Sequence, residues 1–364
     1  MPEFSQLQAA IQAGIDRRLH TCVQIYVSVD GQPVLDAGFG RATSDRPADS
    51  STMMPWRSAG KPVTAAAICR LWQQGDLALE SPIVDLLPKV SRHAVAGSVT
   101  VRQLLTHTSG LPIIDTGWPH KTWDETLRGI LNITSLVPGN AYQPQSTWFL
   151  LGEIIRNKAG TGWSFSDVLK RDVLIPLGMH ATSCGFESDS SNPDHADLLP
   201  DIFDREAAQL VPSSHAAEPW LSQPSPGGNL RGPIRELGQF YEMLMRDGTA
   251  SNGTVWLLPK TVAAMTTRHR TGMYDDTFRH VVDFGLGLIM NSSRYGVDTV
   301  PYGFGRFSSP ESFGHGGSQC SMAFCDPEHR LVVAWAANGF CGEGRHQQRN
   351  RAINEAIYHD LGFS

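Results

Sequence analysis

The sequence predicts a single α/β (α+β) domain over residues 1–364, in which an antiparallel sheet from both termini is flanked by helices and an all-helical lobe is inserted. Two observations predict this fold. β-rich segments stand near both ends of the chain, and the long middle portion consists of helical segments separated by Gly and Pro. We expect the α/β lobe to comprise about 1–60 and 250–364, and the helical lobe about 61–249. A cleft between the lobes is the expected place for a functional site.

The first elements are a helix and a pair of strands. Phe4, Leu7, Ile11 and Ile15 recur at helical spacing and predict an amphipathic helix at the N-terminus. The segments VQIYVSV (23–29) and PVLDAGFG (33–40) predict two strands joined by an Asp-Gly turn.

Five middle segments are expected to be helical: KPVTAAAICRLWQQG (61–75), VRQLLTHTSG (101–110), WDETLRGIL (123–131), STWFLLGEIIRNKAG (146–160) and SFSDVLKRDVLIPLGM (164–179). Near the C-terminus, 319–325 and LVVAWAA (331–337) predict two strands, and a helix is expected near 347–359. The terminal strands would pair with one another to form one sheet.

Composition excludes several classes of function. A chain of 364 residues with 41% hydrophobic residues can bury a large core. The net charge is −6 and no block of five or more Lys or Arg occurs, so we expect neither nucleic acid nor a membrane surface as a partner. No run of about 18 apolar residues and no signal-peptide pattern is present, and the expected location is cytoplasmic.

The cysteines and histidines give no reason to expect a metal. Six cysteines are sparse for this length and fit reduced thiols. Thirteen histidines contain no HExxH motif, and no CxxC pair accompanies them. We therefore expect no metal and no organic cofactor.

The most informative motif is Ser-x-x-Lys at Ser58 and Lys61. If Ser58 opens a helix, a spacing of three places the Lys61 amine beside the Ser58 hydroxyl on the same helical face. Serine is a poor nucleophile without such a neighbour, and a desolvated lysine can serve because burial disfavours its charged form. By itself the tetrapeptide favours a simple helix N-cap with a surface lysine. The surrounding sequence decides between a catalytic pair and a simple N-cap.

Further blocks follow Ser-x-x-Lys in order along the chain: VRQLLTHTSGLP (101–112), Pro138-Gly139 before Tyr142, LLGEII (150–155), PLGM (176–179), PGG (226–228), FGLG (284–287) and GHGGS (314–318). With these blocks, the chain from about Val23 to Ala337 resembles the serine β-lactamase and penicillin-binding-protein superfamily. The resemblance is to the branch that holds class C β-lactamases, D,D-peptidases and family VIII carboxylesterases. It implies the β-lactamase/transpeptidase-like fold.

The resemblance also implies roles for single residues. Ser58 would be the acylated nucleophile, Lys61 its partner, and Tyr142 the tyrosine that shuttles a proton. The backbone N–H groups of Ser58 and Ser318 would form an oxyanion hole. The alternative for Tyr142 is a core aromatic residue. His107, in the LLTHTSG block, is expected to have a structural role.

Further residues are candidates for substrate binding. Gly316, Gly317 and Ser318 would lie along a substrate acyl group, because glycine in a strand permits another backbone to come close. The alternative for these glycines is a flexible turn before a strand. Trp56 and Trp148 could face the pocket.

Two departures from the family pattern matter. Pro144 stands where the Tyr-x-Asn element has Asn or Ser, so Gln143, Gln145 or Ser146 would have to substitute for it. His315, the fourth candidate for a catalytic residue, replaces the lysine of the Lys-Thr-Gly motif, which is similar to the version found in esterases and some peptidases of this branch. A neutral histidine holds a substrate carboxylate weakly, which disfavours penicillins and peptide C-termini.

The sequence therefore favours a serine hydrolase that acts through a Ser58 acyl-enzyme on a small ester, amide or thioester. The alternative is an acyltransferase that passes the acyl group to an amine or alcohol. D,D-peptidase or β-lactamase activity comes third, and a non-catalytic binding protein is least favoured. The segment 270–311 is expected to border the cleft and help set specificity. Nothing in the sequence indicates the oligomeric state.

Overall fold

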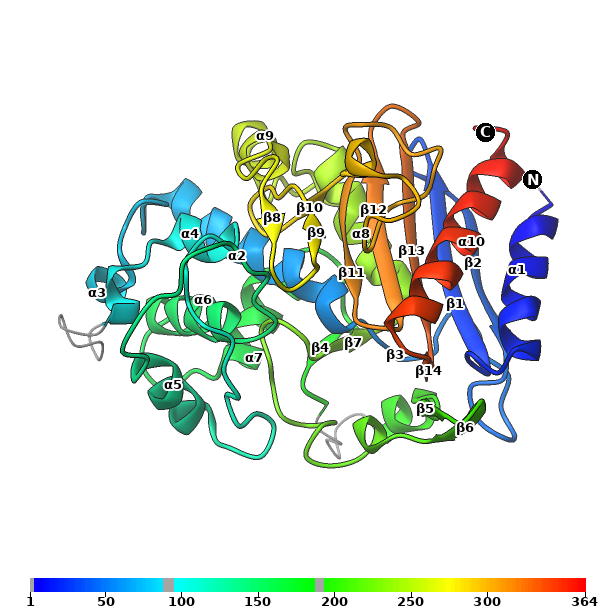
Figure 1. Cartoon of the computed structure of the whole chain (residues 1–364), viewed down its shortest axis with the longest axis horizontal. Helices are drawn as coiled ribbons and strands as arrows, with labels where there is room; N and C mark the ends of the chain where they lie inside the picture. Colours follow the sequence, from blue (N-terminus) through cyan, green and yellow to red (C-terminus); the bar gives the residue numbers. More distant parts are fainter. Residues whose placement is uncertain (1–2, 88–94, 187–192) are drawn as a thin grey trace.

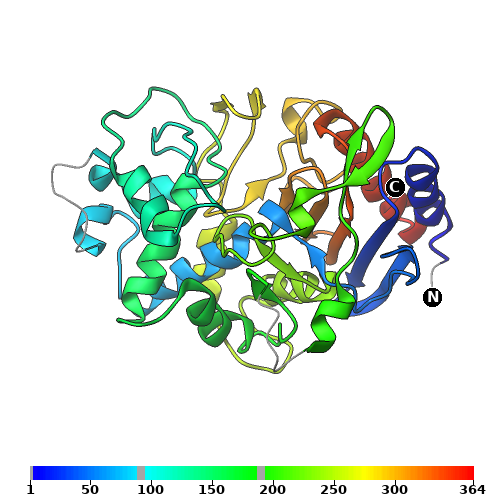
Figure 2. The same cartoon turned by 90° about the horizontal axis from the view of Figure 1, so that it is seen from below.

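The central sheet has six antiparallel strands and is built from both ends of the chain. The structure, a computed structural model, describes residues 3–87, 95–186 and 193–364. The strand order is β10-β11-β12-β13-β1-β2. N-terminal β1 pairs with C-terminal β13 over seven residue pairs, from Val23 opposite Ala337 to Val29 opposite Leu331. The predicted α/β (α+β) class and the pairing of the terminal strands are confirmed, and the two termini lie close together (Figures 1 and 2).

The helices are α1 (Ser5–Asp16), α2 (Lys61–Gln74), α3 (Ile83–Leu86), α4 (Val101–Leu105), α5 (Trp123–Leu131), α6 (Ser146–Lys158), α7 (Phe165–Leu169), α8 (Ile234–Met245), α9 (Pro259–Thr266) and α10 (Glu343–Leu361). The strands are β1 (Cys22–Val29), β2 (Gln32–Gly40), β3 (Met54–Pro55), β4 (Ser183–Cys184), β5 (Phe203–Glu206), β6 (Gln209–Pro212), β7 (Leu230–Gly232), β8 (Tyr274–Asp275), β9 (His280–Val281), β10 (Ile289–Met290), β11 (Phe313–Gly317), β12 (Ser321–Asp326), β13 (Leu331–Ala337) and β14 (Gly339–Phe340). The short helical turn η1 spans Arg57–Gly60.

Both faces of the sheet are covered by helices. Side chains alternate across a strand, so Ile25 and Val333 belong to the core shared with α1 and α10. Tyr26 and Ala334 point the other way and belong to the core that includes α8. Every residue of β13 is buried, as expected for a strand that is covered on both faces.

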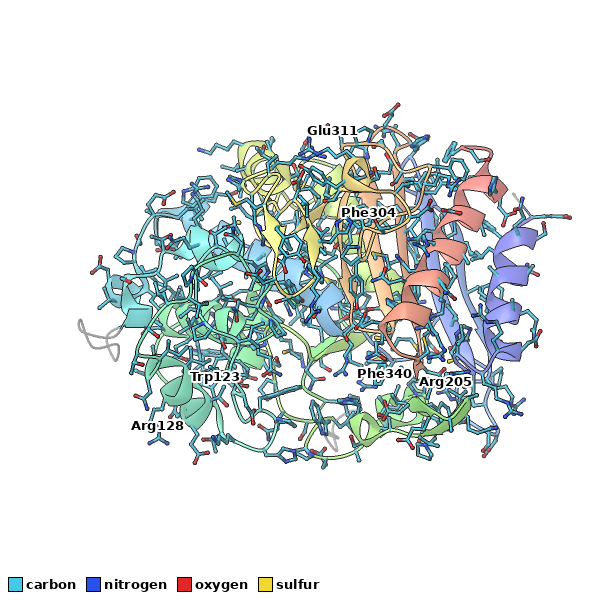
Figure 3. All side chains as sticks on the ribbon, in the orientation of Figure 1. Trp123, Arg128, Arg205, Phe304, Glu311 and Phe340 are labelled. Atoms are coloured by element: carbon cyan, nitrogen blue, oxygen red, sulfur yellow. The ribbon has the colours of Figure 1, made fainter. Side chains whose placement is uncertain are left out.

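The helical lobe packs beside the sheet, and α2 runs between the two parts (Figures 1 and 2). Residues 61–69 of α2 are buried throughout, which explains why the start of this helix carries no polar face. Trp123 and Arg128 of α5 mark the far side of the helical lobe in Figure 3, whereas Phe304 and Glu311 lie in the part that holds the sheet.

The lobe boundary expected at residue 249 differs from the observed packing. Helix α8 lies before that boundary, yet it contacts β1, β12 and β13. The Tyr26 hydroxyl of β1 donates a hydrogen bond of 2.6 Å to Glu242 of α8. The amphipathic pattern of α8 predicts that one face is buried but cannot indicate which partner buries it.

Within the described residues, no helix has both the length and the apolar character needed to cross a bilayer. All six cysteines are buried and unpaired in disulfides.

Candidate active site

The turn that carries Ser58 is held between β7 and β12. The backbone N–H of Trp56 donates to the Leu230 carbonyl at 3.0 Å, and its indole N–H donates to the Gly232 carbonyl at 3.0 Å. The Ser321 hydroxyl of β12 donates to the Trp56 carbonyl at 2.6 Å. Ser58 therefore stands on a turn that is anchored to two different sheets.

Ser58 lies in η1 rather than in the first turn of the α-helix, which begins at Lys61. The expectation that Ser58 opens the helix is therefore inaccurate in detail. Its consequence still holds, because η1 runs directly into α2 and brings the Lys61 Nζ atom to 3.0 Å from the Ser58 Oγ atom.

The residue before Ser58 has an unusual backbone. Arg57 adopts a φ of +51°, in the left-handed region that non-glycine residues seldom occupy. Its guanidinium lies 4.7 Å from the centre of the Phe340 ring and 3.2 Å from the His215 Nε2 atom. Such conformations persist only where the surroundings impose them, and the contacts with Phe340 and His215 hold Arg57 directly before Ser58.

The Lys61 amine has three oxygen neighbours. It lies 3.0 Å from the Ser58 hydroxyl and 2.9 Å from the Pro144 carbonyl, and it also donates to the Gly227 carbonyl. No part of the residue is exposed. Burial, reinforced by the positive charge of Arg57, holds the pKa of Lys61 well below its usual value. A neutral amine can donate to the two carbonyls and keep its lone pair for the serine hydroxyl.

Position 227 requires glycine because the Lys61 side chain lies against its backbone. A Cβ atom at this position would lie 2.9 Å from the Lys61 Nζ atom and 2.7 Å from the ring of Trp148. The neighbouring Thr64 hydroxyl donates to the Pro226 carbonyl at 2.7 Å and fixes the same segment. The PGG block of the sequence thus supplies a carbonyl to the lysine.

Tyr142 is buried beside Ser58 and Lys61. Its ring centre lies 5.4 Å from the Lys61 Nζ atom and 5.8 Å from the His315 ring centre. Burial raises the pKa of Tyr142 above its usual value, while a hydrogen bond with Ser58 acts in the opposite direction. The phenol is thus held in its neutral form, in which its hydroxyl can both donate and accept.

An ion pair that sequence reasoning missed positions Tyr142. The Asp275 carboxylate accepts a 2.9 Å hydrogen bond from the Tyr142 backbone N–H and pairs with Arg270 at 2.9 Å, and both charged side chains are fully buried. Asp275 lies more than 100 residues from Tyr142 along the chain, so local sequence gave no signal for this contact. The Tyr142 ring also packs on Phe278 at 4.7 Å and on His107 at 4.8 Å, a packing contact for His107.

Pro144 stands where the family pattern has a residue with an amide side chain. Its backbone carbonyl oxygen lies 2.9 Å from the Lys61 Nζ atom. None of the expected substitutes takes this role. The Gln143 amide donates to the Leu111 carbonyl at 2.5 Å, and the Gln145 amide oxygen accepts from Thr116. Ser146 is buried at the start of α6.

His315 faces the same space from β11. Its Nδ1 atom lies 2.7 Å from the Gly316 carbonyl, so Nδ1 must carry the proton and Nε2 is left as an acceptor. Nε2 is buried and has no hydrogen-bond partner among the described residues. Burial lowers the pKa of His315 to about 3, so the ring is neutral at physiological pH.

The two glycines after His315 accommodate the protein's own packing. A Cβ atom at Gly316 would overlap the Tyr302 ring, and one at Gly317 would overlap the Trp56 carbonyl and the Ser321 hydroxyl. The sequence predicted that another group comes close to these glycines. The groups found there are Tyr302, Trp56 and Ser321 of the same chain. The alternative of a flexible turn is wrong, because both glycines are paired in β11.

These side chains border a cavity of about 570 Å³. Residues from the nucleophile turn, the tyrosine element, strand β11 and the start of α10 line it: Ser58, Tyr142, Pro144, Thr277, Phe278, Pro301, Tyr302, His315, Gly316, Ser318, Glu343, Gly344 and Gln347. The segment 270–311 borders it through four of these residues, as expected. Trp56, Gln143, Trp148 and Gly317 lie outside the lining, and the ring of Trp148 packs 5.1 Å from the Lys61 Nζ atom instead.

The fold agrees with the matches to known proteins. The profile of the Beta-lactamase family matches residues 7–358, so the chain belongs to this family of serine hydrolases. The chain is 29% identical over 297 residues to esterase EstB of Burkholderia gladioli, covering 73% of this chain and 74% of EstB. It is 25% identical over 320 residues to penicillin-binding protein 4* of Bacillus subtilis, covering 83% of this chain but only 64% of that protein.

Solved structures match over nearly the whole chain. A family VIII carboxylesterase superposes with a TM-score of 0.78 at 21% identity and covers 99% of this chain and 98% of its own. EstCE1, described as a hydrolase with promiscuous acyltransferase activity, has a TM-score of 0.79 at 21% identity and covers 97% of this chain and 98% of its own. The resemblance inferred from the sequence blocks, and the fold it implied, are confirmed.

Proposed function

We propose that the protein is a serine hydrolase that acts through an acyl-enzyme at Ser58 on small esters or amides. The contact between the Lys61 Nζ and Ser58 Oγ atoms, 3.0 Å in a setting where Lys61 is fully buried, carries this proposal. A general base must lie within hydrogen-bond reach of the proton that it removes, and its pKa must be low enough for it to be neutral. Lys61 lies within that reach, and burial shifts its pKa in the required direction.

In acylation, the Ser58 hydroxyl proton passes to the Lys61 lone pair as Oγ forms a bond to the substrate carbonyl carbon. The bond from that carbon to the leaving oxygen or nitrogen then breaks, and the leaving group takes a proton from the Tyr142 phenol. The phenol regains its proton from Lys61, which returns to the neutral amine. Because burial raises the pKa of Tyr142, the phenol acts as a relay and Lys61 as the resting base.

In deacylation, water attacks the acyl carbon and its proton moves to Lys61. The bond from carbon to Oγ breaks, Lys61 returns its proton to Oγ and becomes neutral again, and a carboxylic acid leaves. The backbone N–H groups of Ser58 and Ser318, two residues that line the cavity, are the proposed donors to the oxyanion. Each donor of this kind is worth about 3 kcal/mol in acyl transfer.

Esters are favoured over penicillins and peptide C-termini. Those substrates carry a carboxylate, and His315 offers it a neutral ring whose free nitrogen is an acceptor. The similarity to EstB, an esterase, supports the same preference.

Acyl transfer to an amine or alcohol is the second candidate. It requires only that the acceptor replace water in deacylation. The printed description of EstCE1, a structural neighbour over 97% of this chain, is the observation that favours it.

Intact-protein mass spectrometry with 4-nitrophenyl acetate tests the proposal. We expect a gain of one acetyl group on the wild-type chain and none on Ser58→Ala. A second nucleophile, such as a primary amine, should leave the rate of adduct loss unchanged for a hydrolase and accelerate it for a transferase. Full turnover by Ser58→Ala would refute the mechanism and favour a binding protein with adventitious hydrolysis. A cephalosporin, offered as a third substrate, should acylate Ser58 more slowly than the ester.

A further inference from the structure

A carboxylate is held in the wall of the cavity. Glu343 is in the first turn of α10, and its Oε2 atom accepts a 2.6 Å hydrogen bond from the Tyr302 hydroxyl. Its Oε1 atom accepts a 3.1 Å hydrogen bond from the Ser318 hydroxyl. A carboxylate has about four acceptor positions, so about half of them remain free. The glutamate is therefore fixed in place while it can still bind another group.

Tyr302, which orients the carboxylate, is itself rigidly placed. Its backbone φ is +53°, and its N–H donates to the Gln347 side chain at 3.0 Å. The Tyr302 ring fills the space beside Gly316 that a Cβ atom would occupy. The position of the carboxylate thus depends on the same strand that carries His315.

Those cavity-lining residues that the structure describes carry a negative charge and no positive one. Among the described residues that line it, Glu343 is the only acidic side chain and His315 the only basic one. The His315 ring is neutral and presents its unpartnered, buried Nε2 acceptor. Lys61 is already engaged with three oxygen atoms. Within the described lining, the charged or basic side chains thus offer a substrate the Glu343 carboxylate and the His315 acceptor nitrogen, and no positive charge.

Aromatic rings complete the arrangement. Tyr302 and Phe278 line the cavity with their ring centres 6.0 Å apart. A ring face attracts a cation through its quadrupole, and the attraction adds to that of a nearby carboxylate. A carboxylate, an acceptor nitrogen and two aromatic rings together form a surface that suits a positive charge and disfavours a negative one.

We propose that the preferred substrates are esters or amides that carry an ammonium group, and that Glu343 determines this specificity. The inference rests on the proposed acyl transfer at Ser58. Glu343 takes no part in bond making or breaking; it binds the charged end of the substrate.

Two pairs of isosteric esters test the inference, because each pair differs only in a positive charge. Acetylcholine is compared with 3,3-dimethylbutyl acetate for a charge on the alcohol side. For the acyl side, the 4-nitrophenyl ester of 4-(trimethylammonio)butanoate is compared with that of 5,5-dimethylhexanoate. Glu343 is an exposed residue, so its charge is screened by water and the gain is modest. We expect kcat/KM to favour the charged member of at least one pair by about threefold to tenfold. Higher ionic strength should reduce the ratio.

Glu343→Gln preserves the size of the side chain and removes its charge, so the ratio should fall to about one. The matched control is Glu328→Gln, in the exposed turn between β12 and β13, which should retain the wild-type ratio. The inference is refuted if neither pair shows a preference for the cation, or if Glu343→Gln retains it. Failure of the proposed function gives a different result, namely equal turnover of every ester by wild type and Ser58→Ala.

Discussion

Replacing Gly227 with alanine should disable the site without changing any residue that takes part in the reaction. The added Cβ atom would lie 2.9 Å from the Lys61 Nζ atom and 2.7 and 2.8 Å from two atoms of Trp148. Ordinary contacts begin near 3.5 Å, and the Trp148 Cβ atom is fixed by its own backbone, so no side-chain rotation removes this overlap. The Gly227 segment or the Trp148 backbone must therefore move by more than half an ångström, and the Gly227 carbonyl that contacts Lys61 moves with its segment.

The size of the effect follows from this displacement. Overpacking of a buried site costs about 1–3 kcal/mol of folding stability. A misplacement of about 1 Å in a catalytic geometry costs about 100-fold in rate. We therefore expect Gly227→Ala to remain folded, with a lowered midpoint of thermal unfolding, and to lose about 100-fold in the rate of Ser58 acylation.

Gly228→Ala is the matched control. A Cβ atom at Gly228 meets nothing closer than the Ser225 hydroxyl at 3.9 Å, so stability and rate should both stay near the wild-type values. Acylation is followed by mass spectrometry with 4-nitrophenyl acetate, at a temperature where circular dichroism shows each variant to be folded. Equal rates for Gly227→Ala and Gly228→Ala would refute the role assigned to the Gly227 cradle.

Three further predictions concern the neighbouring residues. Lys61→Met should slow acylation by about 10²–10⁴-fold because the base is lost, yet maintain or raise the free energy of unfolding because a buried amine is removed. Lys61→Arg should be as slow, since a guanidinium cannot become neutral, and an active arginine variant would argue against Lys61 as a base. His315 has a pKa of about 3 when folded, below its unfolded value, so its contribution to stability is complete above about pH 6.5 and is lost as pH falls toward 3. Urea unfolding should therefore show that the free energy of unfolding falls between pH 7 and pH 5 by about 2 kcal/mol less for His315→Asn than for wild type. Equal decreases in the two proteins would contradict a neutral buried ring. Gly316→Ala should destabilise the fold by about 1–3 kcal/mol, and less so in a Tyr302→Ala background; strictly additive effects would show that the two residues do not compete for space.

The catalytic efficiency should decrease when the pH is lowered. Lys61 must be neutral to accept the serine proton, and burial holds its pKa well below the usual value. Measured kcat/KM should therefore persist below the usual pKa range of lysine and fall as the pH decreases through the lowered pKa of Lys61. A flat profile down to the pH of acid unfolding would contradict this assignment.

Much of the site follows from local sequence. Ser58 and Lys61 are three residues apart, and a helical turn of any kind brings such positions together, so the contact survives even though Ser58 lies in η1 rather than α2. The strands at both ends were also predictable, because alternation and Gly-containing turns are local signals. Membership of the family rested on several blocks in order rather than on geometry.

The sequence by itself thus determined the fold class, the Ser58 and Lys61 pair, and the prediction of Tyr142 as its neighbour. Only the tertiary structure decided that the Pro144 carbonyl contacts Lys61 and that Asp275 accepts a hydrogen bond from the Tyr142 backbone. The same is true of the hydrogen bond by which Tyr302 holds Glu343 in the cavity wall. The physical reason is the same in each case. These contacts join segments 41 to 133 residues apart or use a backbone atom, and neither leaves a pattern in the local sequence.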